Sequence, residues 1–200
     1  MAWIIRLASG DDAECVSDIY GPVVESTPMS FEIEPPNEQE MARRIQDTLP
    51  SHPWLVLEGQ DGVVGYAYAS RHRGRAAYQW SVETSVYVHA KVQRRGVGRG
   101  LYTSLIEILV AQRFANAYAG ITLPNDGSVA LHETMGYQAI GTFRNVGFKF
   151  GGWHDVGWWQ LPLRAAVDSP TPPLSLSEVQ REPSWRRRLE AGLPCVRGVS

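Results

Sequence analysis

Residues 81–101 read SVETSVYVHAKVQRRGVGRGL and combine a strand pattern with a basic, glycine-rich turn. From Val82 to Val88 every second residue is apolar or β-branched, and this period of two is typical of a strand with two distinct faces. The other face carries the carboxylate of Glu83. From Leu101 the apolar residues recur with a helical period, so we expect a strand, a turn and the start of a helix.

The turn at residues 93–100, QRRGVGRG, has the composition of an anion-binding site. The N-terminus of a helix leaves backbone N–H groups unpaired and carries the positive end of the helix dipole. Glycine lets the backbone approach an anion closely, and arginine forms charge-assisted hydrogen bonds with phosphate oxygens. The sequence therefore predicts a pyrophosphate site.

The spacing within this turn disfavours two common nucleotide sites. A dinucleotide-binding turn needs G-x-G-x-x-G at the strand end and an acidic residue about 20 positions later. Here the glycines are Gly96, Gly98 and Gly100, and residues 116–120 contain no Asp or Glu. A Walker loop needs Gly-Lys-Ser/Thr, which the sequence lacks. NAD and ATP are therefore poorly supported.

Strand and helix patterns alternate on both sides of this stretch and predict a mixed α/β sheet. Pro22 should kink or end the first helix, and Asp61-Gly62 is a strong hairpin signal. The expected elements are, in order, a strand at 3–7, helices at 11–24 and 37–49, strands at 54–57, 63–69 and 82–88, a helix from 101 to 114, a strand at 118–123, a helix at 128–135, and strands at 137–143 and 153–163.

Length and composition suggest one domain with a tail. Two hundred residues with 44% hydrophobic content suit a single substantial core, which we expect within residues 1–164. Residues 165–200 are rich in proline, serine and arginine and predict a flexible linker with a basic tail. A net charge of −2 gives no general argument for a nucleic acid or membrane partner.

The two cysteines, Cys15 and Cys195, do not make a disulfide framework. No stretch has the pattern of a signal peptide or of a membrane-spanning helix. We therefore expect a cytoplasmic protein.

Six ordered blocks of the sequence together resemble the phosphinothricin acetyltransferase group of the GCN5-related N-acetyltransferase superfamily. The blocks are TPMSFE (27–32), AYQWSVETSVYV (77–88), QRRGVGRGLY (93–102), LPND (123–126), LHETMGY (131–137) and VGFKFGGWHDVGWWQ (146–160). The resemblance covers about residues 3–163. It implies the fold of that superfamily, a central twisted mixed sheet of about seven strands with about four helices. It also implies acetyl-CoA as a cosubstrate, no metal, and a homodimer.

Glu83 is the candidate general base, because an amine nucleophile is an ammonium ion at neutral pH and must lose a proton. The resemblance places a catalytic glutamate at this position. Many members of the superfamily carry a Leu-Tyr-Glu pattern before the glycine-aromatic pair, but this chain has Leu131-His132-Glu133. His132 is therefore a second catalytic candidate, as an acid, as a base or as a substrate ligand.

The cofactor site implied by the resemblance follows the central strand and the glycine-rich turn, with contacts from the next loop. A backbone N–H at Val88 or its neighbour would stabilise the oxyanion of the acyl-transfer step. The expected cofactor-binding residues are Val86, Tyr87, Val88, Gln93, Arg94, Arg95, Gly96, Val97, Gly98, Arg99, Asn125 and Ser128.

The expected substrate is a small amino acid such as phosphinothricin, methionine sulfoximine or methionine sulfone. Such a substrate carries anionic or oxygen-rich groups that guanidinium groups and an aromatic wall can bind. Arg73 and Arg75 before the central strand, and Phe31 in the loop at 27–32, are the candidates.

Two alternatives remain open at this point. The same chemistry can serve another amine, such as a polyamine, an aminoglycoside or a protein N-terminus. A non-catalytic acyl-CoA-binding module is the alternative from a different class.

Overall fold

The computed structural model describes residues 3–197, which contain a seven-stranded mixed sheet with the strand order β1-β2-β3-β4-β5-β7-β6. This confirms the predicted fold class. Only β4 and β5 run parallel; every other neighbouring pair in the described sheet is antiparallel. The strands are β1 (Ile4–Leu7), β2 (Trp54–Gly59), β3 (Gly62–Arg71), β4 (Ser81–Val88), β5 (Asn116–Leu123), β6 (Gln138–Lys149) and β7 (Gly152–Pro162).

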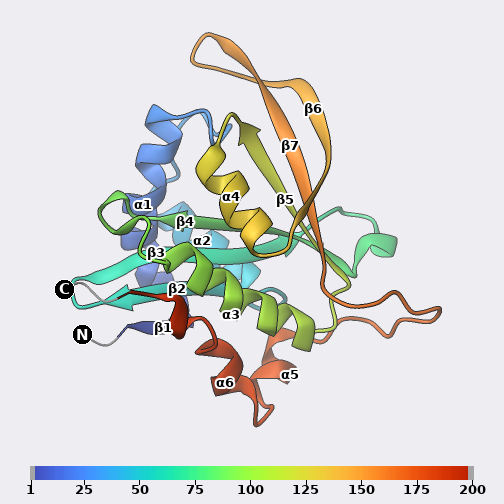
Figure 1. The fold of residues 1–200 in the computed structure, drawn as a ribbon. Coiled ribbons are helices and arrows are strands. Elements are labelled where there is room, and N and C mark those ends of the chain that lie inside the picture. Colours follow the sequence, from blue (N-terminus) through green and yellow to red (C-terminus); the bar gives the residue numbers. More distant parts are fainter. Residues whose placement is uncertain (1–2, 198–200) are drawn as a thin grey trace.

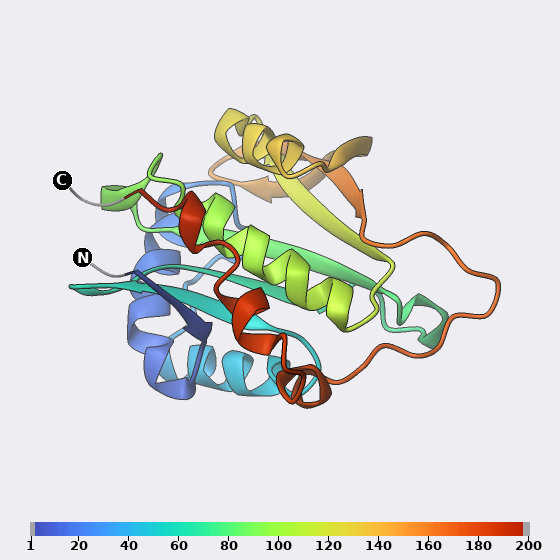
Figure 2. The same ribbon diagram turned by 60° about the horizontal axis from the view of Figure 1, so that its bottom comes forward.

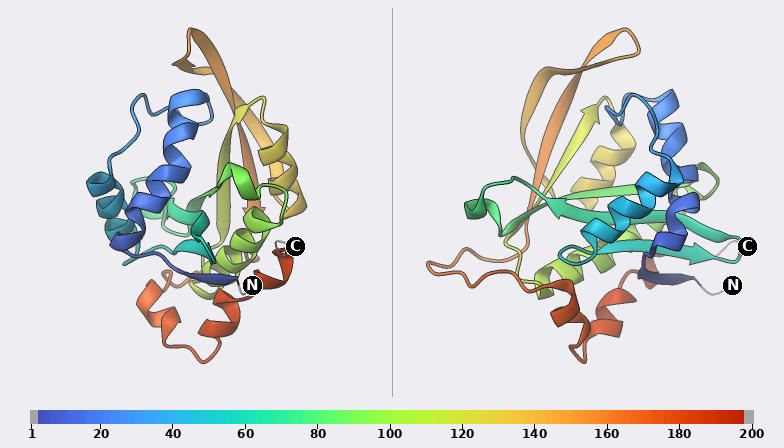
Figure 3. Two further views of the ribbon diagram at one scale, coloured as in Figure 1. Left: turned by 90° about the vertical axis from the view of Figure 1, so that its left-hand side faces the viewer. Right: turned by 180° about the vertical axis from the view of Figure 1, so that it is seen from behind.

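Helices cover both faces of the sheet (Figures 1 and 3). On one face lie α1 (Ala13–Ser26) and α2 (Glu38–Thr48), and on the other lie α3 (Val97–Ala111) and α4 (Asp126–Thr134). Each face buries its own apolar cluster, one built around α3 and the other around α1 and α2. Successive side chains of β4 point to opposite faces of the sheet and so belong to different clusters. Val82 faces α3, and Tyr87 faces α1.

The pairing of β4 with β5 is short. Within the described residues the two strands share register only from Ser81↔Asn116 to Glu83↔Tyr118, and then they separate. Beyond that point β4 continues to Val88 and β5 to Leu123. The separation leaves an opening in the middle of the sheet, between β4 and β5, which are both labelled in Figure 1.

Pro22 does not end α1, which continues to Ser26. Proline has no N–H group to donate to the carbonyl four residues earlier in a helix, and here that carbonyl belongs to Asp18. Both Asp18 and Pro22 are exposed, so water can satisfy that carbonyl. The predicted hairpin at Asp61-Gly62 is present, with Gly62 at a φ of 99° between β2 and β3.

The segment after β7 differs from the flexible tail that composition predicts. It forms two further short helices, α5 (Leu176–Gln180) and α6 (Trp185–Leu189), and runs back beside α3 (Figure 2). Leu176 and Val179 are 2% and 0% exposed. Burying two such side chains contributes about 1.5–3 kcal/mol each, and Trp185, Leu189, Leu193 and Val196 pack against the same core cluster. The domain boundary at residue 164 stays a prediction.

The β6–β7 hairpin extends beyond the rest of the molecule (Figure 1). Its large apolar side chains are exposed, with Phe148 at 56% and Trp153 at 63%. Among the described residues no helix has the length and apolar character needed to cross a membrane.

Candidate active site

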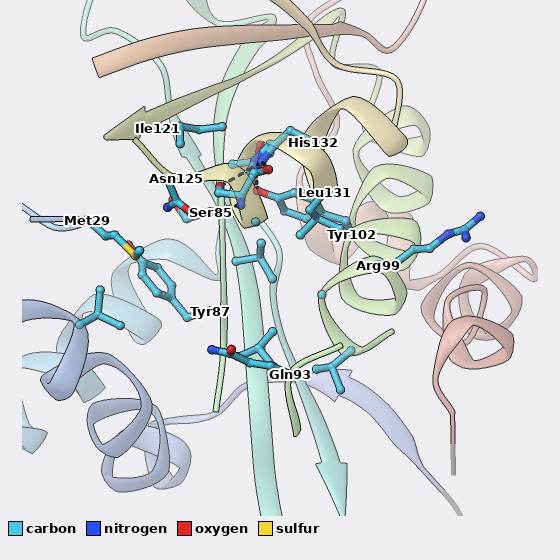
Figure 4. Close-up of a pocket in the computed structure, with 18 of the residues that line it drawn as sticks. Met29, Ser85, Tyr87, Gln93, Arg99, Tyr102, Ile121, Asn125, Leu131 and His132 are labelled. Atoms are coloured by element: carbon cyan, nitrogen blue, oxygen red, sulfur yellow. Dashed lines mark hydrogen bonds between the residues drawn. The ribbon is translucent and has the colours of Figure 1, made fainter. Parts of the chain in front are cut away.

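A cavity of about 540 Å³ lies where β4 and β5 separate. Its walls come from both faces of the sheet, with Met29 from the α1–α2 loop on one side and Leu131 from α4 on the other (Figure 4). Of the residues predicted to bind the cofactor, all except Arg95 line it. These lining residues are Val86, Tyr87, Val88, Gln93, Arg94, Gly96, Val97, Gly98, Arg99, Asn125 and Ser128.

The N-terminus of α3 forms one end of this cavity. The N-cap residue Gly96 has a φ of 81°, and Arg94 before it has a φ of 61°. Two left-handed residues in this turn direct the chain sharply from the strand into the helix, and glycine adopts this geometry without steric cost. The first N–H groups of α3 have no partner within the helix, so they are available to an anion.

His132 lies at the other end, on α4, and is 4% exposed. Its Nδ1 lies 2.7 Å from the carbonyl oxygen of Ser128, which can only accept, so Nδ1 carries the hydrogen. Its Nε2 therefore accepts from the hydroxyl of Tyr102, at 2.9 Å. Figure 4 shows this pair at the edge of the cavity.

Burial sets the charge of both groups in this pair. It lowers the pKa of His132, partly opposed by the hydrogen bond to Ser128. It raises the pKa of Tyr102 well above its usual value. Both side chains are therefore neutral near pH 7, with one shared proton between an oxygen and a nitrogen.

Glu83 occupies the last register position before β4 and β5 separate. Its side chain is 36% exposed, and Oε1 lies 3.0 Å from Nδ1 of His72. An ionised carboxylate only accepts, so His72 Nδ1 donates to it. Glu83 does not line the cavity described above, but its neighbours Thr84 and Ser85 do.

Aromatic rings surround the His72–Glu83 pair. The imidazole of His72 stacks on Tyr118 with ring centroids 4.4 Å apart and meets the edges of Tyr78 and Trp158. Trp158 Nε1 is buried and has no hydrogen-bond partner among the described residues. The imidazole that holds the carboxylate is thus fixed among three aromatic rings.

The three predicted substrate residues lie outside the cavity. Phe31 packs against β6, where a side chain at Gly147 would overlap its ring, and Met29 of the same loop lines the cavity instead. Arg73 and Arg75 are exposed in the loop between β3 and β4. That loop also carries His72, so the structure brings the two arginines to the side of the sheet where Glu83 lies.

A buried lysine fixes the loop that carries Met29 and Phe31. Lys149 of β6 is 5% exposed, and its Nζ donates to the backbone carbonyls of Val24, Thr27 and Ser30. The three N–H donors of the ammonium group are thereby satisfied. The hairpin and the α1–α2 loop are joined at this point.

Sequence reasoning missed two residues of this region, His72 and Tyr102. His72 stands between two arginines in what reads as a solvated basic loop, and Tyr102 reads as a core position of a helix. A polar group on an apolar helix face was the available signal for Tyr102, since a buried hydroxyl needs a partner.

A split mixed sheet, with a helix N-terminus at one end of the opening and a carboxylate at its apex, defines a protein that holds an elongated anionic ligand between two strands. The chain belongs to the GNAT acetyltransferase family: the family described as acetyltransferase (GNAT) domain matches residues 5–158.

Curated relatives and solved structures agree with this assignment. The chain is 44% identical over 169 residues to a phosphinothricin N-acetyltransferase of Streptomyces viridochromogenes, covering 84% of this chain and 90% of the relative. It is 33% identical to a methionine sulfoximine and methionine sulfone acetyltransferase of Salmonella typhimurium, covering 82% and 98%. A Sinorhizobium meliloti phosphinothricin acetyltransferase solved with acetyl-CoA superposes with a TM-score of 0.80 at 31% identity, covering 88% and 99%.

Proposed function

We propose that this protein transfers an acetyl group from acetyl-CoA to the amino group of a small amino acid such as phosphinothricin, methionine sulfoximine or methionine sulfone. The observation that carries the proposal is the position of Glu83, a carboxylate at the apex of the opening between β4 and β5. The acceptors after which the relatives are named support the same class of acceptor.

The cavity suits acetyl-CoA in shape and in chemistry. It is elongated along β4, and it ends at the free N–H groups of α3, which suit a pyrophosphate. Gln93 and Arg94 stand at that end, and Asn125 and Ser128 stand on α4 across from it. When bound, acetyl-CoA supplies an acetyl group activated as a thioester.

Glu83 is the base in this proposal. It accepts a proton from the ammonium group of the amino acid, which then becomes a nucleophile. His72 holds the carboxylate by its Nδ1–H bond, and the stack on Tyr118 fixes the plane of the imidazole. The carboxylate is thereby aimed while a third of its surface stays open to an incoming amine.

Tyr102 and His132 hold the second transferable proton. The Tyr102 oxygen faces the cavity, and its hydrogen is directed to Nε2 of His132. The Tyr102 hydroxyl would give its hydrogen to the thiolate that leaves when the C–S bond breaks, and its oxygen would then take up a proton from solvent. His132 therefore acts through Tyr102.

Acceptor choice rests on the loop between β3 and β4. Arg73 and Arg75 carry unpaired positive charge in the described structure, on the loop that also positions His72. Guanidinium groups bind carboxylate and phosphinate oxygens bidentately. Met29, in the loop that Lys149 holds, borders the opposite side of the cavity, while Phe31 of the same loop packs against β6.

The exposed hairpin supports a homodimer. Ile140, Phe143, Phe148 and Trp153 leave 48–63% of their surfaces exposed on β6 and β7. An apolar patch of this kind is typical of a face covered by another protein chain, here a second copy. Sedimentation of the protein at micromolar concentration as a monomer would remove this proposal. The cytoplasmic location stays a prediction.

The experiment that tests the function measures release of the free CoA thiol from acetyl-CoA. The acceptors are phosphinothricin, methionine sulfoximine, methionine sulfone, glutamate, spermidine and a short peptide. We expect selective turnover of the first three. Turnover only with spermidine or the peptide would support acetyl transfer but contradict the proposed amino-acid acceptor. CoA binding without any turnover would favour a non-catalytic binding module.

A further inference from the structure

The C-terminal segment follows α3 from one end to the other. At the C-terminal end of the helix, Leu174 N donates to Gln112 O and the Gln112 side chain donates to Leu174 O. In the middle, the hydroxyl of Ser104 donates to Leu189 O and accepts from Gly192 N. The segment therefore runs antiparallel to α3 and ends beside its N-terminus (Figure 2).

At that N-terminus the segment contacts the glycines of the predicted pyrophosphate turn. A side chain at Gly96 would overlap the carbonyl of Cys195, and one at Gly100 would lie 2.8 Å from Gly192 O and from a methyl group of Val196. A side chain at Gly192 would in turn overlap the backbone of Gly100. Two of the three glycines thus face the C-terminal segment, while Gly98 faces β4 and Leu131.

A backbone hydrogen bond completes this contact. Arg197 N donates to Arg95 O at 2.9 Å, within the turn that leads into α3. Arg94 and Gly96 on either side hold left-handed conformations. The carbonyl group of Arg95, between them, therefore points in a fixed direction. The C-terminal segment supplies its hydrogen-bond donor.

We propose that residues 192–197 are a structural part of the cofactor site. They hold the turn at residues 93–98 in the conformation that presents the N-terminus of α3 to a pyrophosphate, and they do so from the side opposite the cavity. This inference rests on the proposed function for the identity of the ligand. The matched family spans residues 5–158, so the segment lies outside it.

The test uses full-length protein with the substitutions Gly192→Ala and Val196→Ser. Gly192→Ala forces the segment away from Gly100, and Val196→Ser, at a half-buried position, removes the methyl group that lies beside Gly100. Gly141→Ala is the matched control, because a side chain there meets nothing within 4 Å. Calorimetry measures the dissociation constant of CoA, and hydrogen exchange measures the amides of residues 95–99 without ligand.

We expect both variants to weaken CoA binding on the order of tenfold, within the usual range of coupling between sites. The amides of residues 95–99 should exchange faster in the ligand-free variants. Coupling is reciprocal, so CoA should slow exchange in residues 192–197 of the wild type. Unchanged CoA affinity and unchanged exchange at 95–99, in a variant whose residues 192–197 exchange freely, would overturn the proposal. Failure of the wild type to bind CoA would instead overturn the proposed function, and the exchange of the ligand-free turn would still test the coupling.

Discussion

His72 Nδ1 lies 3.0 Å from Glu83 Oε1, and the two residues come from a loop and a strand that are 11 positions apart in sequence. The Glu83 side chain is 36% exposed, while the imidazole is 12% exposed and stacked on Tyr118. The histidine is therefore the rigid partner, and it orients the carboxylate that we propose as the base.

Replacing Glu83 by glutamine should remove the base and keep the shape of the site. We expect kcat to fall by about 10²–10⁴-fold, the usual contribution of a general base. CoA affinity should not change, because Glu83 lies outside the cavity lining. Steady-state assays of CoA thiol release check this, and a variant as fast as the wild type would refute the assignment.

Two substitutions of His72 separate its hydrogen bond from its stacking. His72→Asn can keep an N–H near the Nδ1 position, whereas His72→Phe keeps only the ring on Tyr118. Loss of a hydrogen bond to a charged group should lower kcat by about tenfold in His72→Phe. We expect His72→Asn to recover most of this activity, with KM for acetyl-CoA unchanged in both. Higher activity of His72→Phe than of His72→Asn would mean that the stacking, and not the hydrogen bond, matters.

A matched pair of tyrosine substitutions tests the proton that Tyr102 donates to His132. Tyr102→Phe removes the hydroxyl that donates to His132, and Tyr137→Phe removes a hydroxyl that pairs with Thr84 at 2.8 Å. Both tyrosines are buried, but only Tyr102 lines the cavity. We expect a decrease in kcat of at least about tenfold for Tyr102→Phe alone. A similar loss in both variants would point to packing of the tyrosine cluster.

Lys149→Met should destabilise the protein and loosen the acceptor side. The substitution leaves the carbonyls of Val24 and Ser30 buried without their donor. Each orphaned group costs about 1–3 kcal/mol of unfolding free energy. Urea unfolding should show the loss, and KM for the amino acid should rise. Lys91→Met, at an exposed position, is the control and should leave both quantities unchanged.

His52 should make stability depend on pH above the range where carboxylates titrate. Burial, with a smaller effect of Arg71, lowers the pKa of His52 from 6.5 to about 4. Below pH 6.5 the unfolded chain binds a proton that the folded chain does not, so stability falls as pH falls toward 4. The full contribution is on the order of 2–3 kcal/mol, and the lowered pKa of His132 acts in the same direction.

Urea unfolding at pH 7 and at pH 5.5 measures this effect. His52→Phe retains an aromatic ring against Phe114 but cannot titrate, so it should reduce the difference between the two pH values. An identical pH dependence in wild type and variant would show that other groups control acid stability.

The sheet and the glycine-rich turn could be predicted because their signals are local. The period of two at residues 82–88 and the glycine spacing at 96–100 each lie within a few positions, and the structure has the expected strand, turn and helix. The seven strands follow from the same kind of pattern.

The pairing of His72 with Glu83 could not be predicted, because it depends on how a nine-residue loop folds over the end of β4. Composition likewise misjudged the C-terminal segment. Proline and serine dominate it, yet Leu176 and Val179 stand three positions apart and bury on one helical face. Apolar side chains that can pack against the domain therefore order this segment, although its overall composition predicts a flexible tail.

The separation of β4 and β5 has a consequence for how the protein behaves without its ligand. An open sheet has two outer edges, but here two inner strands also present unpaired N–H and C=O groups to each other across the opening. Exposed strand edges are the usual starting points of aggregation, because another chain can add to them. A ligand lying between the strands covers both, so acetyl-CoA would act as a solubilising partner as well as a reactant, and purification in its presence should give the more tractable protein.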